Sequence, residues 1–106
     1  MASLKKQKVL RIYLEEKMKW KNQPLYRALV ERLLKLGIPG ATVFRGLEGF
    51  GASARIHEAR ILEISENLPI VVEVVAPGPV ILKSLKAVKE MIPKHCLVTV
   101  QDVHVI

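Results

Sequence analysis

Hydrophobic and polar residues alternate along several short segments of the chain, as they do in β-strands with one buried face. In residues 8–14, Leu10 and Ile12 occupy the same face of the expected strand. The last β-rich segment breaks its alternation near Gln101 and Asp102, which favours a bulge or an early end there. Strands are expected over residues 8–14, 41–44, 70–75 and 97–106, and an additional short strand over residues 61–64 is left open.

Two other segments place their apolar residues at helical spacing. Residues 24–36 begin with Pro24, which suits a first helical turn, and precede Gly37, which suits a C-terminal cap. A second apolar stripe stops at Pro93 and comprises Ile81, Leu85, Val88 and Ile92. We therefore expect two helices of similar length.

The order of these elements is strand, helix, strand, glycine-rich segment, strand, helix, strand. Right-handed crossovers then place both helices on one face of a four-stranded antiparallel sheet, which is an α+β fold with ferredoxin-like βαββαβ topology. The uncovered face would carry Val9, Tyr13, Val71 and Val75, or the set of opposite parity. Because an apolar uncovered face usually packs against another subunit, we expect a homo-oligomer.

Length and composition fit one globular domain that covers residues 1–106. The single cysteine, Cys96, cannot form an internal disulfide, and the first residues lack the apolar run of a signal peptide. No apolar stretch approaches the roughly 20 residues that span a bilayer. We expect a cytoplasmic protein that does not insert into membranes.

The positive charge of the chain is concentrated in its first half. Residues 1–45 hold eleven lysines and arginines against three glutamates, whereas residues 46–106 hold six against seven acidic residues. Such a basic region could attract nucleotide phosphates, nucleic acid or an acidic partner. A solvated basic face with no ligand is the equally ordinary alternative.

The segment from Thr42 to His57 starts as a strand and becomes a loop, at about residues 46–60, with glycines at 46, 49 and 51. Glycines allow positive φ angles and a close approach of the backbone to a ligand. Arg45, Arg55 and His57 supply donors that suit an anion. This pattern is typical of a binding loop.

Other motifs are weaker. The run from Gly49 to Ala54 matches G-x-G-x-x-A, but a dinucleotide-binding fold needs a parallel sheet that this element order does not provide. The same run lacks the aromatic residues of an RNA-binding signature. The histidines and Cys96 lack zinc-site spacing, and no group of residues forms a catalytic constellation. We therefore expect neither an enzyme nor a resident cofactor.

Several motifs in combination resemble the PII family of nitrogen-signalling proteins, and still more closely an uncharacterised PII-like family known as a domain of unknown function. The resemblance covers roughly residues 9–92. It rests on the runs R-I-Y-L-E, P-L-Y-R-A, G-A-T-V-F-R-G, G-F-G, R-I-H and L-P-I-V-V-E-V-V.

This resemblance implies a compact homotrimer packed through its sheets, with ATP or ADP bound in the cleft between subunits. The candidate ligands for this chain are ATP, ADP and AMP. Thr42 matches the position that contacts the adenine side of the ligand. The base of the loop that reports ligand state is matched by Gly49, Phe50 and Gly51. Arg55 and His57 would then lie within this loop.

The chain also departs from the PII pattern. The phosphate-binding run T-G-x-x-G-D-G-K is replaced by the residues from Met91 to Cys96, and the C-terminal arginines of PII are replaced by Val103 to Ile106. Phosphates would have to be held by other groups. The candidates are Lys17, Lys19, Arg45, Arg55 and the backbone N–H groups of residues 49–52.

The leading hypothesis from the sequence is a sensor that binds an adenine nucleotide or another small anion between subunits and regulates an unidentified partner protein. A nucleic-acid-associated module that uses the basic first half is the alternative. A metal-responsive trimer related in fold to copper-tolerance proteins is a third hypothesis, supported only by fold analogy and scattered histidines.

Overall fold

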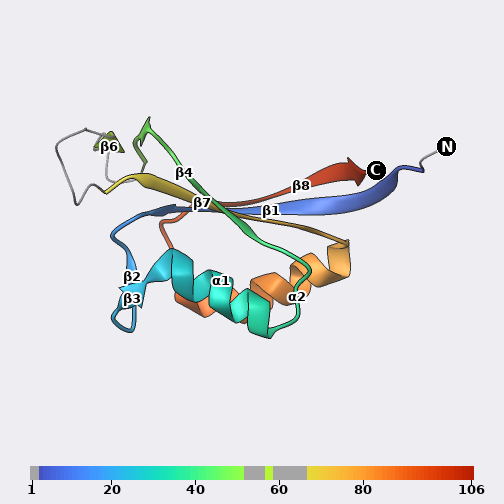
Figure 1. Cartoon of the computed structure of the whole chain (residues 1–106), viewed down its shortest axis with the longest axis horizontal. Coiled ribbons are helices and arrows are strands. Elements are labelled where there is room, and N and C mark those ends of the chain that lie inside the picture. Colours follow the sequence, from blue (N-terminus) through green and yellow to red (C-terminus); the bar gives the residue numbers. More distant parts are fainter. Residues whose placement is uncertain (1–2, 52–56, 59–66) are drawn as a thin grey trace.

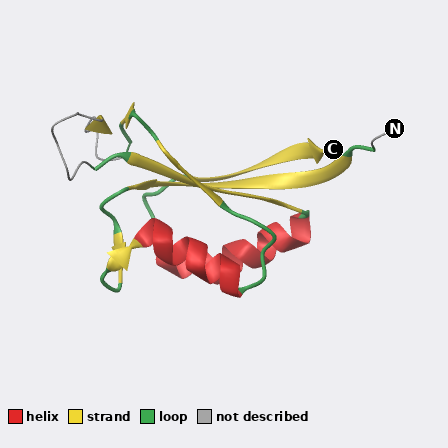
Figure 2. Cartoon of the chain, viewed as in Figure 1, coloured by secondary structure: helices red, strands yellow, loops and turns green. Residues whose placement is uncertain are grey.

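The computed structural model describes residues 3–51, 57–58 and 67–106. Its centre is an antiparallel sheet of four strands in the order β4-β7-β1-β8. These strands are β1 (Lys5–Glu15), β4 (Thr42–Arg45), β7 (Pro69–Ala76) and β8 (Val98–Val105). Helices α1 (Leu25–Lys35) and α2 (Gly78–Val88) lie together on one face of the sheet, and the 3-10 helix η1 (Lys89–Met91) follows α2 (Figure 1, Figure 2). The predicted α+β, ferredoxin-like βαββαβ fold is confirmed.

The covered face of the sheet is built from alternate residues of the two central strands. Leu10 and Ile12 on β1 and Val72 on β7 are fully buried, as is Leu29 on α1. Ile81 on α2 joins the same core. The alternation that predicted the strands therefore also selects the face that the helices cover.

The uncovered face carries the first of the two predicted residue sets. Tyr13 and Val75 are 38% and 40% exposed, and Val71 is half-buried. Val9 is on the same face but is only 4% exposed, since Val75 and Gln101 flank it on the neighbouring strands. Much of this face is apolar, and none of the described elements covers it.

One row of polar residues crosses this apolar face. Arg11 of β1 donates from Nε to Glu73 Oε2 at 2.9 Å and from Nη1 to Gln101 Oε1 at 2.8 Å. These contacts join β7, β1 and β8. Arg11 and Glu73 are both partly buried, and their opposite charges satisfy each other.

The prediction of a bulge or early end near Gln101 and Asp102 is wrong. β8 pairs with β1 without a break from Val98 to Val105. The sequence alternation looked disturbed because both residues are polar, but each has a partner on its own face of the sheet. Gln101 accepts from Arg11, and Asp102 accepts from Lys8.

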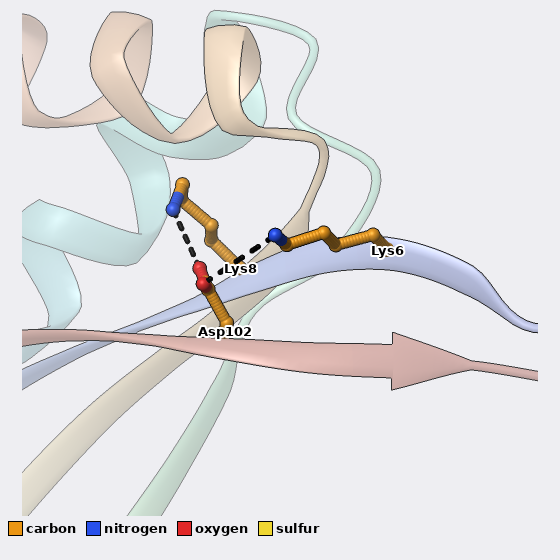
Figure 3. A network of polar contacts seen from close by, with 3 residues as sticks. All are labelled: Lys6, Lys8 and Asp102. Atoms are coloured by element: carbon orange, nitrogen blue, oxygen red, sulfur yellow. Dashed lines mark hydrogen bonds and ion pairs between the residues drawn. The ribbon is translucent and has the colours of Figure 1, made fainter.

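The contacts of Asp102 lie near the end of the sheet where the first and last strands meet. Lys8 Nζ is 2.6 Å from Asp102 Oδ1, and Lys6 Nζ is 3.9 Å from Oδ2 (Figure 3). The hydrogen bond from Lys8 and its charge lower the pKa of the Asp102 carboxyl, and the charges of Lys6 and His104 act in the same direction.

Two short hairpins were not predicted. β2 (Lys19–Trp20) pairs with β3 (Gln23–Pro24) through a turn in which Lys21 and Asn22 have φ angles of 47° and 68°. Two consecutive positive φ angles are typical of a tight two-residue hairpin turn. β5 (Glu48–Gly49) pairs with β6 (His57–Glu58) inside the predicted loop.

The predicted strand at 61–64 lies outside the described residues. Within the described parts of the chain, no helix is long and apolar enough to cross a membrane.

We expect Ile12→Ala to lower the free energy of unfolding by about 2–5 kcal/mol, because the removed atoms leave a cavity in a fully packed core. Urea denaturation at a fixed protein concentration measures this. Leu34→Ala is the matched control: Leu34 is 74% exposed on α1, and its truncation should change stability by less than about 0.5 kcal/mol. Equal losses in the two variants would contradict the assignment of the core.

We expect the Asp102 carboxyl to titrate below its ordinary range, and Lys8→Met to raise its pKa towards that range. A pH titration followed by carbon-13 NMR of the carboxyl measures both. Because the pKa is lowered by folding, the contribution of this exposed pair is present at neutral pH and is lost as the pH falls through the lowered pKa. Lys5→Met, which removes a lysine outside this pair, should leave the titration nearly unchanged; an equal shift would argue against the contact.

Candidate functional site

A pocket of about 250 Å³ opens where β1 ends. Tyr13, Glu15 and Met18 line it from the end of β1 and the turn that follows. The base of the glycine-rich segment, residues 48–51, forms a second wall, and residues 95–97 before β8 form a third. Three segments that are far apart in the sequence therefore build this site.

Pro69, the first residue of β7, holds the glycine-rich wall in place. Gly46 N donates to Pro69 O at 2.7 Å. A Cβ on Gly46 would come within 3.1 Å of the Pro69 side chain, and one on Gly49 within 3.0 Å. Glycine is favoured at these two positions because a Cβ would crowd the proline ring, which would have to move by a few tenths of an ångström.

The packing against Pro69 changes the role that the sequence predicted for the loop glycines, which was to allow positive φ angles. Among the described glycines, only Gly37 has a positive φ, at 84°. Gly46, Gly49 and Gly51 are therefore not used for unusual backbone angles. Gly46 and Gly49 give close packing against Pro69, while a Cβ on Gly51 would face open space.

Two aromatic rings line the pocket. Phe50 is 75% exposed although it belongs to a structured wall, and Tyr13 is 38% exposed on the uncovered face of the sheet. The buried residues Leu14 and Ile70 also belong to its lining. An exposed aromatic ring beside an apolar pocket provides a surface on which a flat ligand could stack.

The charged residues that line the pocket are acidic. Glu15 and Glu48 line it, and no lysine or arginine does so among the residues that the structure describes. Asn67 Nδ2 donates to Glu15 Oε1 at 2.7 Å, and Lys17 N donates to Asn67 Oδ1 at 2.9 Å. This network orients the Glu15 carboxylate beside the pocket.

Cys96 and Met18 contact each other in the pocket wall. The Cys96 thiol donates a weak hydrogen bond to Met18 Sδ, with the two sulfur atoms 3.8 Å apart. Partial burial, together with the negative charge of Glu15, raises the pKa of the Cys96 thiol. A raised pKa keeps the sulfur in its neutral thiol form at pH 7, which argues against a nucleophilic role.

Arg45 lies at the end of β4 and forms an ion pair with Glu16 of the same chain. The Glu16 side chain is only 20% exposed, whereas that of Arg45 is 58% exposed. Glu16 N is fixed by a 2.8 Å hydrogen bond to Leu68 O. In this structure the guanidinium of Arg45 therefore has an internal partner.

The structure brings some of the predicted site residues together and separates others. Gly49, Phe50 and Gly51 share the pocket wall. Thr42 is exposed and pairs in register with Glu73 on the sheet, so it is not among the residues that line the pocket. The backbone of His57 pairs with Gly49, whereas Arg55 lies outside the described residues.

Sequence analysis did not identify the contributions of Tyr13, Glu15 and His95 to this pocket, or that of Cys96. One feature of the sequence did point to part of this wall. The segment from Met91 to Cys96 was recognised as the counterpart of the PII phosphate-binding run, and its last two residues do form a wall of the pocket.

Comparison with known proteins identifies the relatives of this chain. The family model DUF190, described as “Uncharacterized ACR”, matches residues 7–105. The UPF0166 protein of Aquifex aeolicus (strain VF5) is 36% identical over 102 residues, which are 95% of this chain and 94% of the relative. UPF0166 protein MJ1524 of Methanocaldococcus jannaschii is 35% identical over 100 residues, which are 94% and 92% of the two chains.

Solved structures share the fold. CPII from Thiomonas intermedia K12, in its complex with ADP and bicarbonate, matches with a TM-score of 0.71 and 22% identity, covering 97% of this chain and 91% of CPII. TTHA0516, a PII-like protein from Thermus thermophilus, matches with a TM-score of 0.69 and 23% identity, covering 99% and 94%. The chain belongs to the DUF190 (UPF0166) family, and its fold is that of the PII-like proteins.

Proposed function

We propose that this chain is a non-enzymatic PII-like sensor that binds an adenine nucleotide at the pocket beside the glycine-rich segment. CPII, which shares the fold, has been solved with ADP, AMP and bicarbonate. The observation that carries the proposal is the position of Phe50. Its exposed ring lines an apolar pocket whose wall is fixed by Pro69, so a nucleobase can stack there without rearrangement of that wall.

The charges around the pocket suggest how the nucleotide is oriented. Glu15 and Glu48 would repel phosphates, so the base enters the pocket and the phosphates remain outside it. Arg45 pairs with Glu16 and would have to exchange this partner for a phosphate. The other candidate cations are Lys17, Lys19 and Arg55.

Subunit assembly would complete this site. Tyr13 lines the pocket and also belongs to the uncovered, largely apolar face of the sheet. We propose that this face packs in a homotrimer, as the resemblance to PII proteins implies. Subunits joined there would lie beside the pocket, so that a neighbour can contribute contacts to the nucleotide.

The loop at about residues 46–60 would transmit the signal. A nucleotide in the pocket contacts the base of this loop at residues 48–51. If it binds one loop conformation more tightly than another, it shifts the population of the form that a partner protein recognises.

The nucleic-acid alternative has less support. Among the residues that the structure describes, five cations of the basic first half form ion pairs, which reduces the charge available for phosphate backbones. They are Lys6, Lys8, Arg11, Arg32 and Arg45. Salt-sensitive nucleic-acid binding that survives Arg55→Ala, together with an absence of nucleotide binding, would favour this alternative.

We expect calorimetry to detect binding of ADP, AMP or ATP, and Phe50→Ala to weaken it at least fivefold, because stacking of a base on an aromatic ring contributes about 1–3 kcal/mol. Leu47→Ala is the matched control, since Leu47 is 79% exposed and does not line the pocket. It should leave affinity unchanged. An absence of binding to the wild-type protein at millimolar nucleotide would overturn the proposal.

We expect light scattering after gel filtration to give the mass of a trimer, and Val75→Asp to dissociate it, because a charge would be buried in the packed sheet face. Leu82→Asp changes an apolar residue of α2 that is 59% exposed and should leave the trimer intact. A wild-type monomer, or equal behaviour of both variants, would contradict assembly through this face.

A further inference from the structure

Side chains on the uncovered face of the sheet form rows that run across the strands. The register places Glu73 of β7 beside Arg11 of β1. Thr42 of β4 continues this row beyond Glu73, and Thr99 of β8 continues it beyond Arg11. We call these four residues the central row. Gln101, one position further along β8 on the same face, accepts from Arg11 and extends its network.

Apolar residues lie on both sides of the central row. The row nearer the pocket consists of Phe44, Val71 and Tyr13, which are paired across β4, β7 and β1. Phe44 is 50% exposed and Tyr13 is 38% exposed. On the other side of the central row, Val75 of β7 pairs with Val9 of β1. The uncovered face therefore carries a polar row between two apolar rows.

A second copy of the chain packed on this face would remove the central row from water. The side chains of Arg11 and Glu73 are 33% and 23% exposed in the single chain. A buried charge pair is tolerated when its remaining hydrogen-bonding groups also find partners. A guanidinium has five N–H groups, and the contacts among the described residues engage two of those of Arg11. In a packed interface, further acceptors would have to come from the other copy.

The order of the rows restricts how two copies can pack. A central row placed against an apolar row would bury its charges against methyl groups and aromatic rings, which is costly. When the two central rows face each other, Arg11 of one copy can lie against Glu73 of the other, and apolar rows meet apolar rows. Because the central row carries both charges, a second copy of this chain is complementary to it.

We propose that contacts between Arg11 of one copy and Glu73 of the next set the register in which copies of this chain pack sheet against sheet. This register presupposes the homotrimer proposed above, which by itself does not say which residues orient the subunits. Tyr13 belongs both to the adjacent apolar row and to the pocket. The same contacts therefore also determine which part of a neighbouring copy lies beside the nucleotide site.

Exchanging the two charges within one chain tests this register. Arg11→Glu combined with Glu73→Arg keeps an ion pair inside each copy, so the double variant should fold and assemble with itself. An interface between this variant and the wild type would bring like charges together. We expect nitrogen-15-labelled wild type, refolded together with the unlabelled double variant, to form mixed oligomers about tenfold more rarely than random exchange gives. Native mass spectrometry counts the mixed species.

Two controls define random exchange. Labelled and unlabelled wild-type chains should mix at random. Glu31→Lys combined with Lys83→Glu reverses two exposed charges on α1 and α2, on the other side of the sheet (Figure 1), and should also mix at random with the wild type. Random mixing of the wild type with the Arg11 and Glu73 double variant would overturn the proposed register while leaving the homotrimer intact. A wild-type monomer would instead overturn the homotrimer itself.

Glu73→Gln gives a second measurement that needs no reversal of charge. It keeps the size of the side chain and an acceptor for Arg11 but removes the negative charge, so the oligomer should dissociate about tenfold more readily in sedimentation equilibrium. Glu31→Gln, on the exposed side of α1, should assemble as the wild type does. Circular dichroism checks that each variant is folded. Equally tight assembly of Glu73→Gln and the wild type would contradict the proposal.

Discussion

The pairing of β1 along both edges is the constraint on which the rest of the structure depends. With β7 on one side and β8 on the other, the register of β1 cannot shift without breaking both ladders. The register therefore fixes on which face of the sheet each side chain of β1 lies. Leu10 and Ile12 face the helices, whereas Arg11 and Tyr13 lie on the uncovered side, where Arg11 links three strands and Tyr13 reaches the pocket.

Much of the fold could be predicted because the period of its apolar residues is regular. The alternation around Ile12 and the helical stripe that includes Ile81 each correspond to an element whose core side is buried. The hairpin of β2 and β3 could not be predicted in this way, since strands of two residues contain no period. The unbroken β8 was mispredicted because Gln101 and Asp102 find partners on opposite faces, which depends on a strand distant in the sequence.

The candidate site was only partly predictable. The glycines and cations around Phe50 predicted a binding loop, and residues 48–51 of that segment do line the pocket. Its physical basis was not the expected one, because Gly46 and Gly49 accommodate the ring of Pro69 rather than unusual backbone angles. The meeting of Met18 with Cys96 is a tertiary contact between residues that no local pattern connects.

The register of the central strand also has a consequence for how the chain folds. Lys5 pairs with Val105, so the contact that closes the sheet joins residues separated by almost the entire sequence. Such a contact orders a long loop of chain before it returns any stabilisation, which slows folding. During synthesis, one edge of β1 remains open until β8 has left the ribosome, and the nascent chain must avoid pairing that edge with other molecules in the meantime.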